Sequence, residues 1–165
     1  MLKVDELDKK ILEMISCNAR MPFKDVAAEC GVSRAAVHQR VQHLVDAGVI
    51  IGSGFHVNPA SLGYSTCTYV GITLEKGSMY KSVVAEFEKI PEIVECHFVT
   101  GSAALLVKVY CFDNDHLMEV LLNTMQNIPF VQSTDTMISL DQAIERQVWV
   151  KDYKNTSYQT TGERN

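Results

Sequence analysis

The sequence lacks the features that mark several large classes of protein. No apolar run reaches the roughly 18 residues that a membrane-spanning helix needs, and the charged start MLKVDELDKKILEM does not resemble a secretion signal. The chain has 5 cysteines, but no two stand at the CxxC spacing typical of zinc and redox sites. We therefore expect a cytoplasmic protein with no membrane contact, whose thiols stay reduced in or near the core.

Catalytic and metal-binding motifs are also missing. There is no phosphate-binding loop and no nucleophile with a base at motif spacing. Cys96 and His97 have no second ligand pair, and no third ligand is visible for His38 and His43. The sequence therefore predicts no enzyme, no cofactor and no metal. A metabolic enzyme or ligand-storage protein stays open as an alternative, because a fold alone does not exclude catalysis.

The acidic charge is confined to one part of the chain. Of 165 residues, 47% are hydrophobic, so a sizeable core can form, and the formal net charge is -5. Residues 1–58 hold 7 basic and 7 acidic side chains, whereas residues 59–165 hold 8 and 13. A surface that binds a polyanion is therefore expected in the first third of the chain.

Three short helices are predicted in that first third, at residues 5–18, 23–30 and 34–47. Apolar side chains recur at helical spacing in each of them. Between the second and third helices, Gly31 can take a positive φ and Ser33 offers an N-cap oxygen. A three-residue linker that begins with glycine is typical of a helix-turn-helix.

The third predicted helix presents a face suited to a DNA groove. Val37, Val41 and Leu44 form its inner stripe, which leaves alanine, histidine and glutamine pointing outward with an arginine on each flank. Glutamine can bind adenine, alanine can contact a thymine methyl, and arginine can reach guanine or phosphate. The predicted DNA-binding residues are Ser33, Arg34, Ala35, His38, Gln39, Arg40 and Gln42. A merely solvated helix, with Arg34 and Arg40 as ordinary surface residues, is the alternative.

The rest of the chain predicts a second domain of mixed α and β structure. Residues 49–51 are β-prone and lead into a linker at 52–64, and their free edge could pair with a second copy. Strands at 66–75, 93–100, 104–111 and 131–140 alternate with helices at 79–90 and 113–127. This β-α-β-β-α-β order predicts a ferredoxin-like domain over 65–150, so the whole chain is α+β.

Two features of the C-terminal part predict a dimer interface and a flexible end. Residues 69–74 and 105–109 are largely apolar on both faces, which indicates a covered sheet and therefore dimerisation. Residues 151–165 are polar without any apolar period, and we expect a flexible tail there.

Motifs along residues 5–145 resemble the Lrp/AsnC, or feast/famine, family of transcription regulators. The N-terminal ones are D-x-x-I-L, NAR, GVS, the pair Arg40-Val41 and GVI, and the later ones are NPASLGY, VTGSAALLVKV and VQSTDTMISL. The AsnC-like branch is the most similar. The resemblance implies dimers that assemble into tetramers or octamers, with two recognition helices on a pseudo-palindromic duplex. It also implies an effector, usually an amino acid, bound between dimers.

The resemblance assigns the effector site to a glycine-containing loop and to polar residues of the last strand. These positions are Thr100, Gly101, Ser102, Ala103, Ala104, Gln132, Thr134 and Thr136. Ala104 departs from the family pattern, in which aspartate or serine is common, and alanine cannot bind an α-amine. The strand residues could instead form an ordinary polar face. A stand-alone amino-acid sensor without DNA binding is a third possible function, although the intact outward face of the third helix argues against it.

Overall fold

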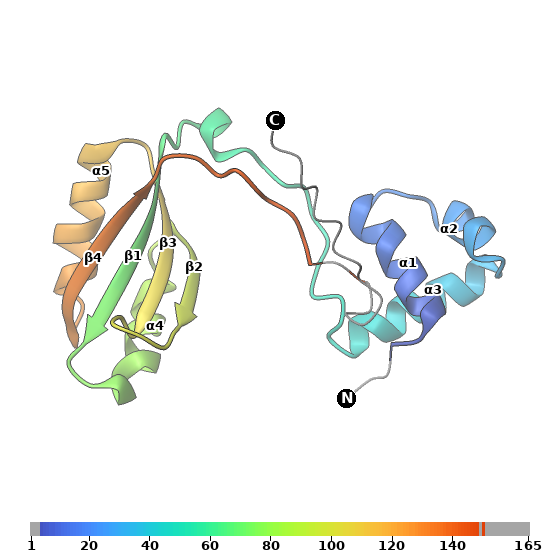
Figure 1. Cartoon of the computed structure of the whole chain (residues 1–165), viewed down its shortest axis with the longest axis horizontal. Helices are drawn as coiled ribbons and strands as arrows, with labels where there is room; N and C mark the ends of the chain where they lie inside the picture. The colour runs from blue at the N-terminus through green and yellow to red at the C-terminus, as the bar shows by residue number, and fades with distance from the viewer. Residues whose placement is uncertain (1–3, 149, 151–165) are drawn as a thin grey trace, which may run out of the picture. The chain divides into compact units, whose positions relative to one another are not determined.

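The computed structural model describes residues 4–148 and residue 150, and these separate into two compact units. One unit holds residues 57–144, and the other holds the N-terminal helices (Figure 1). The division after His56 falls inside the segment 52–64 that the sequence predicts as a linker. The predicted tail at 151–165 lies outside the described residues.

Three helices form the N-terminal unit, as the sequence predicts: α1 (Glu6–Cys17), α2 (Phe23–Cys30) and α3 (Arg34–Asp46). Gly31 ends α2 with a φ of 67°, a left-handed conformation that glycine adopts without strain. Ile11, Val26 and Val37, one from each helix, are fully buried together. Their burial holds α3 against α1 and α2.

The segment after α3 differs from its prediction. No strand forms over residues 49–51, where the β-prone run predicts one. Ile51 is 97% exposed and Phe55 is 78% exposed. A strand needs a hydrogen-bonded neighbour, and a single chain supplies none here. A short 3-10 turn, η1 (Pro59–Leu62), follows and leads into the second unit.

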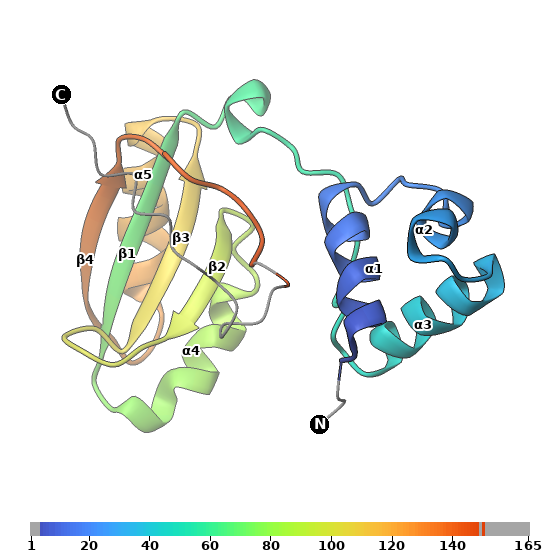
Figure 2. The same ribbon diagram turned by 45° about the vertical axis from the view of Figure 1, so that its right-hand side comes forward.

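The C-terminal unit is a four-stranded antiparallel sheet with helices on one face (Figures 1 and 2). Its elements are β1 (Thr66–Leu74), α4 (Tyr80–Phe87), β2 (Ile93–Phe98), β3 (Leu105–Cys111), α5 (Asn114–Glu119) and β4 (Val131–Ser139). The strand order is β2-β3-β1-β4, which confirms the predicted ferredoxin-like topology.

The second predicted helix of this unit is not regular throughout. After α5 the chain forms a π-type turn, η3 (Val120–Thr124), and a 3-10 turn, η4 (Met125–Asn127). The side-chain amide of Asn127 donates to the carbonyls of Leu122 and Asn123, so these acceptors are satisfied without a continuing helix.

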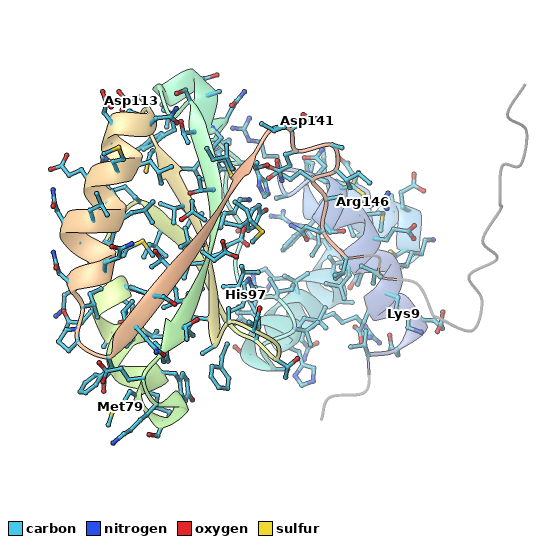
Figure 3. All side chains as sticks on the ribbon, turned by 60° about the vertical axis from the view of Figure 1, so that its left-hand side comes forward. Lys9, Met79, His97, Asp113, Asp141 and Arg146 are labelled. Carbon is cyan, nitrogen blue, oxygen red and sulfur yellow. The ribbon has the colours of Figure 1, made fainter. Side chains whose placement is uncertain are left out.

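The main core lies between the sheet and this helical layer. Ile72 and Val107 from the sheet and Phe87 and Met125 from the helical side are 2% exposed or less. Because Met79 precedes α4 and Asp113 caps α5, the two helices start at opposite ends of the layer (Figure 3). The other sheet face carries no helix of this unit and stays open.

Candidate DNA-binding face and effector site

The recognition helix α3 presents its predicted outward residues to solvent. Val37 and Leu44 are fully buried, so the inner stripe holds the opposite side of the helix. Five of the predicted DNA-binding residues are exposed along α3 itself: Arg34, Ala35, His38, Gln39 and Gln42. None of them is acidic, and the first turn of α3 contains no acidic residue.

The start of α3 is fixed by a side-chain cap. The Oγ of Ser33 accepts a hydrogen bond of 3.1 Å from the backbone N–H of Ala36. The other free N–H groups of this first turn give it partial positive charge, which favours a phosphate nearby. The His38 ring meets the Phe23 ring edge-on at 6.0 Å, and the Gln42 amide donates to Asp46 at 2.9 Å. The two contacts leave Gln39 as the outward amide with no hydrogen bond within the described chain.

Arg40 does not share the free exposure of its neighbours. Its Nη1 donates to Asp5 Oδ2 and to Asp8 Oδ1, each at 2.7 Å. Both acids also form the capping box of α1, because each carboxylate accepts the backbone N–H of the other residue. The arginine therefore joins the recognition helix to the start of α1.

These hydrogen bonds shift the pKa values of Asp5 and Arg40. The pKa of Asp5 is lowered, first by the hydrogen bond from the backbone of Asp8 and next by the bond from Arg40. The pKa of Arg40 is raised, chiefly by its hydrogen bonds to Asp8 and Asp5. Asp5 and Arg40 are thus charged at neutral pH.

The predicted effector loop connects β2 to β3 and rests on β1. Thr100, Gly101 and Ser102 are exposed, whereas Ala103 and Ala104 are half-buried. The Ala104 N–H donates to the Ile72 carbonyl at 2.9 Å. Gly71 lies below this loop, and a Cβ at that position would stand 3.3 Å from the Ala103 Cβ and 3.9 Å from the Asp135 Cβ. The absence of a side chain at Gly71 therefore lets the loop approach β1 closely.

The predicted effector residues of β4 do not all lie beside this loop. Thr134 pairs with Ile72 and Thr136 with Val70, so both side chains point to the helix-covered side of the sheet. The Thr134 hydroxyl accepts a hydrogen bond of 2.8 Å from the Gln126 amide. Gln132 is exposed next to a register shift.

Asp135 is the β4 residue that lies beside Gly71, the β1 position against which Ala103 of the loop packs. It pairs with Gly71 on the open side of the sheet. The sequence did not single out Asp135 or Gly71, since only the register of β1 against β4 places them together. Alternation along VQSTDT shows that Asp135 faces away from Thr134 and Thr136, but not which side is open.

The open sheet face carries an unexpected charge. Lys108 is 8% exposed and lies 3.4 Å from a Glu95 carboxylate oxygen. Its ammonium stands 5.9 Å from the Tyr69 ring and 5.4 Å from the Tyr110 ring. Burial, the largest single influence, lowers the pKa of Lys108, but the electrostatic effects of Glu95, Tyr110 and Tyr69 together outweigh it, so the net pKa is raised. This face is therefore amphipathic rather than wholly apolar. His97 of β2, labelled in Figure 3, lies 3.6 Å from Glu95.

Two family descriptions match the chain, one over each unit. Residues 4–51 match a winged helix-turn-helix DNA-binding domain, and residues 67–149 match the Lrp/AsnC ligand-binding domain. The chain belongs to the Lrp/AsnC family. It is 37% identical over 145 residues to the regulatory protein AsnC of Escherichia coli, with 88% of this chain and 95% of that protein covered.

Other proteins are also similar to this chain in sequence or in structure. The HTH-type transcriptional regulator FL11 of Pyrococcus horikoshii is 31% identical over 83% of this chain and 89% of its own. The solved structure of Escherichia coli AsnC has a TM-score of 0.84, covering 89% of this chain and 99% of that one. A feast or famine regulatory protein from M. tuberculosis, solved with L-methionine, is 25% identical with a TM-score of 0.83, over 89% and 99%.

Membership of the Lrp/AsnC family confirms the main functional prediction. The chain is a transcription regulator with a helix-turn-helix DNA-binding domain and a ligand-binding domain, and it is not an enzyme. Among the described residues, none of the helices combines the length and apolar character needed to cross a membrane.

Proposed function

We propose that α3 reads duplex DNA in the major groove and that an amino acid bound by the C-terminal unit controls this reading. The observation that carries the proposal is the exposed, acid-free row of side chains on α3, namely Arg34, Ala35, His38, Gln39 and Gln42. Such a row can contact base edges while the capped start of the helix lies against phosphate. We also propose a cytoplasmic location, in keeping with the transcription regulators to which the chain is similar.

The individual residues take different roles in this proposal. Gln39 reads a base edge, for which adenine suits its amide, and Ala35 packs on a thymine methyl. Arg34, at the exposed first position of α3, reaches phosphate or guanine. Ser33 uses its hydroxyl for the helix cap, and its contribution is to hold the N–H groups of the first turn in place.

Dimerisation through the open sheet face completes the DNA-binding unit. Tyr69, Leu106 and Tyr110 are only partly exposed there and surround the nearly buried Lys108. A second copy would cover these side chains, and it would also bring a second α3 to the same duplex. Assembly of dimers into a tetramer or octamer, with the effector between dimers, extends this proposal.

The effector is an amino acid held beside the loop of residues 100–104. A relative from M. tuberculosis was solved with L-methionine, which supports this class of ligand. The hydroxyls of Thr100 and Ser102 and the peptide groups of Gly101 suit a carboxylate. Ala103 and Ala104 contribute shape only. Gln132 of β4, which is exposed, would then complete the cleft with a neighbouring dimer, whereas Thr134 and Thr136 point to the helix-covered side of the sheet, away from this loop.

Selection of duplexes from a random pool tests DNA reading. The wild-type protein should enrich a pseudo-palindromic sequence, and Gln39→Ala should relax the preference at one position per half-site by about 1–3 kcal/mol. Lys89→Ala, which removes an exposed cation of the other unit, is the matched control and should bind like wild type. Failure of the wild type to enrich any sequence would contradict the proposal.

A stand-alone sensor would give a different result in the same experiment. It would bind an amino acid, with no enriched duplex in its presence or absence.

A further inference from the structure

Arg40 is the predicted DNA-binding residue whose surroundings point to another role. We propose that Arg40 is a positioning residue, which locks the recognition helix to α1 through Asp5 and Asp8. We call these three residues the acidic clasp. The proposal deepens the DNA reading proposed above and rests on it.

The hydrogen bonds of the clasp are complementary. Asp5 Oδ1 accepts the Asp8 N–H at 2.8 Å, and Asp8 Oδ2 accepts the Asp5 N–H at 3.1 Å. The remaining oxygens, Asp5 Oδ2 and Asp8 Oδ1, are those that Arg40 Nη1 contacts at 2.7 Å. The two hydrogens of one nitrogen thus serve the two carboxylates of the capping box.

Burial makes this contact more than a surface ion pair. The Asp8 side chain is 10% exposed and that of Arg40 is 35% exposed, whereas Asp5 is 51% exposed. A nearly buried carboxylate needs a charged partner, because it has lost most of its hydration. Asp8 therefore holds Arg40 against α1.

The clasp controls a geometry that apolar packing leaves soft. Ile11 and Val37 hold α1 and α3 together, but apolar contacts are non-directional and tolerate small rotations of a helix about its axis. The two short bonds to Arg40 are directional and oppose such rotations. A base-reading side chain such as Gln39 must be placed to within about 0.5 Å, so a small rotation of α3 matters.

The two possible roles of Arg40 predict opposite effects when the acids are neutralised. If Arg40 contacts DNA phosphate, Asp5 and Asp8 compete with the duplex, and removing their charge should strengthen binding. Removing two negative charges near DNA should strengthen binding by simple electrostatics as well. If the clasp positions α3, the same change should weaken binding, although it makes the domain more basic.

The double variant Asp5→Asn/Asp8→Asn makes this test. Asparagine is as good an N-cap as aspartate, so the capping bonds have acceptors in both proteins. We expect roughly tenfold weaker binding to a duplex selected with the wild-type protein, with equal helix content by circular dichroism. The double variant should also lose its preference for that duplex over a scrambled one. If the clasp contributed only to folding stability, a variant that is still folded would keep this preference.

Two further variants keep the test decisive. Asp5→Asn alone removes the exposed member of the clasp, so it should fold and weaken binding less than the double variant. Asp25→Asn removes one exposed charge from the first turn of α2, outside the clasp, and should bind as well as wild type or better. Tighter binding by Asp5→Asn or by the double variant would overturn the positioning role. A wild-type protein that selects no duplex would instead overturn the proposed function itself.

Discussion

Replacing Gly71 with alanine should disturb the loop of residues 100–104, the proposed effector site, more than it destabilises the C-terminal unit. Gly71 lies inside β1 and its φ is ordinary for a strand, so alanine meets no backbone strain there. The added Cβ would stand 3.3 Å from the Ala103 Cβ. Carbon atoms in good contact lie about 3.5–4.0 Å apart, so one neighbour must move by a few tenths of an ångström.

The positions of the two neighbours indicate which one moves. Asp135 is held in the ladder between β1 and β4, whereas Ala103 belongs to the loop before β3. Overpacking costs about 1–3 kcal/mol, and replacing glycine in the unfolded chain returns about 0.4–1 kcal/mol. The net destabilisation is therefore about 0–2.6 kcal/mol, with the displacement concentrated in residues 100–104.

Two measurements on the full chain test this expectation. Urea unfolding should show the modest loss of stability, and the amino acid that most changes DNA affinity in the wild type should act more weakly on Gly71→Ala. Gly77→Ala is the matched control, because no atom lies within 4 Å of its added Cβ and its φ is not positive. If Gly71→Ala matched Gly77→Ala in both unfolding and effector response, the proposed closeness of loop and β1 would be refuted.

Three other predictions concern DNA, the dimer and alkaline stability. Arg34→Ala should remove two phosphate contacts per dimer, so the slope of log affinity against log salt concentration should become shallower by about 1.8. The difference in affinity between the variant and the wild type should therefore shrink about 12-fold between 50 and 200 mM salt. An unchanged slope in gel-shift titrations would show that Arg34 does not contact phosphate. Leu106→Arg, which places a charge on the open sheet face, should give a monomer by analytical ultracentrifugation. The control Leu122→Arg should remain dimeric, because Leu122 lies in the helical layer, where it is 49% exposed. A dimeric Leu106→Arg would exclude the open sheet face as the interface. Burial raises the pKa of Cys111 to about 11, so the folded protein holds this proton longer than the unfolded chain, and stability should fall as pH rises from 9 to 11. Cys111→Ala should be less stable overall and should show a shallower fall in thermal unfolding, because among the described residues only the raised pKa values of Cys96, Lys108 and Tyr110 then contribute to it; an equally steep fall would contradict the role of Cys111.

The helices, and the order of helices and strands along the chain, follow from local patterns in the sequence. Val37, Val41 and Leu44 recur at helical spacing. Val37 and Leu44 are buried and Val41 is partly buried, so the outward residues of α3 lie where the pattern predicts them. Gly31 and Ser33 mark the turn because their conformations depend on adjacent residues alone.

Contacts between distant residues explain what the sequence did not predict. Arg40 lies at the border of the inner stripe of α3, but its partners Asp5 and Asp8 are 35 and 32 residues away. In the same way, the side on which Thr134 and Asp135 point depends on the register of β4 against β1, which the sequence of β4 alone does not determine. The missing strand at residues 49–51 needs a neighbour from outside the single chain.

The coupling between an amino acid and DNA affinity tests the account most directly. The measurement is the dissociation constant of the wild-type protein for its selected duplex, with and without each amino acid in turn. We predict that at least one amino acid changes this constant by about fivefold or more, and that the duplex changes the affinity for that amino acid by the same factor. A constant that no amino acid alters would contradict the account, because the C-terminal unit would then not control the reading of DNA by α3.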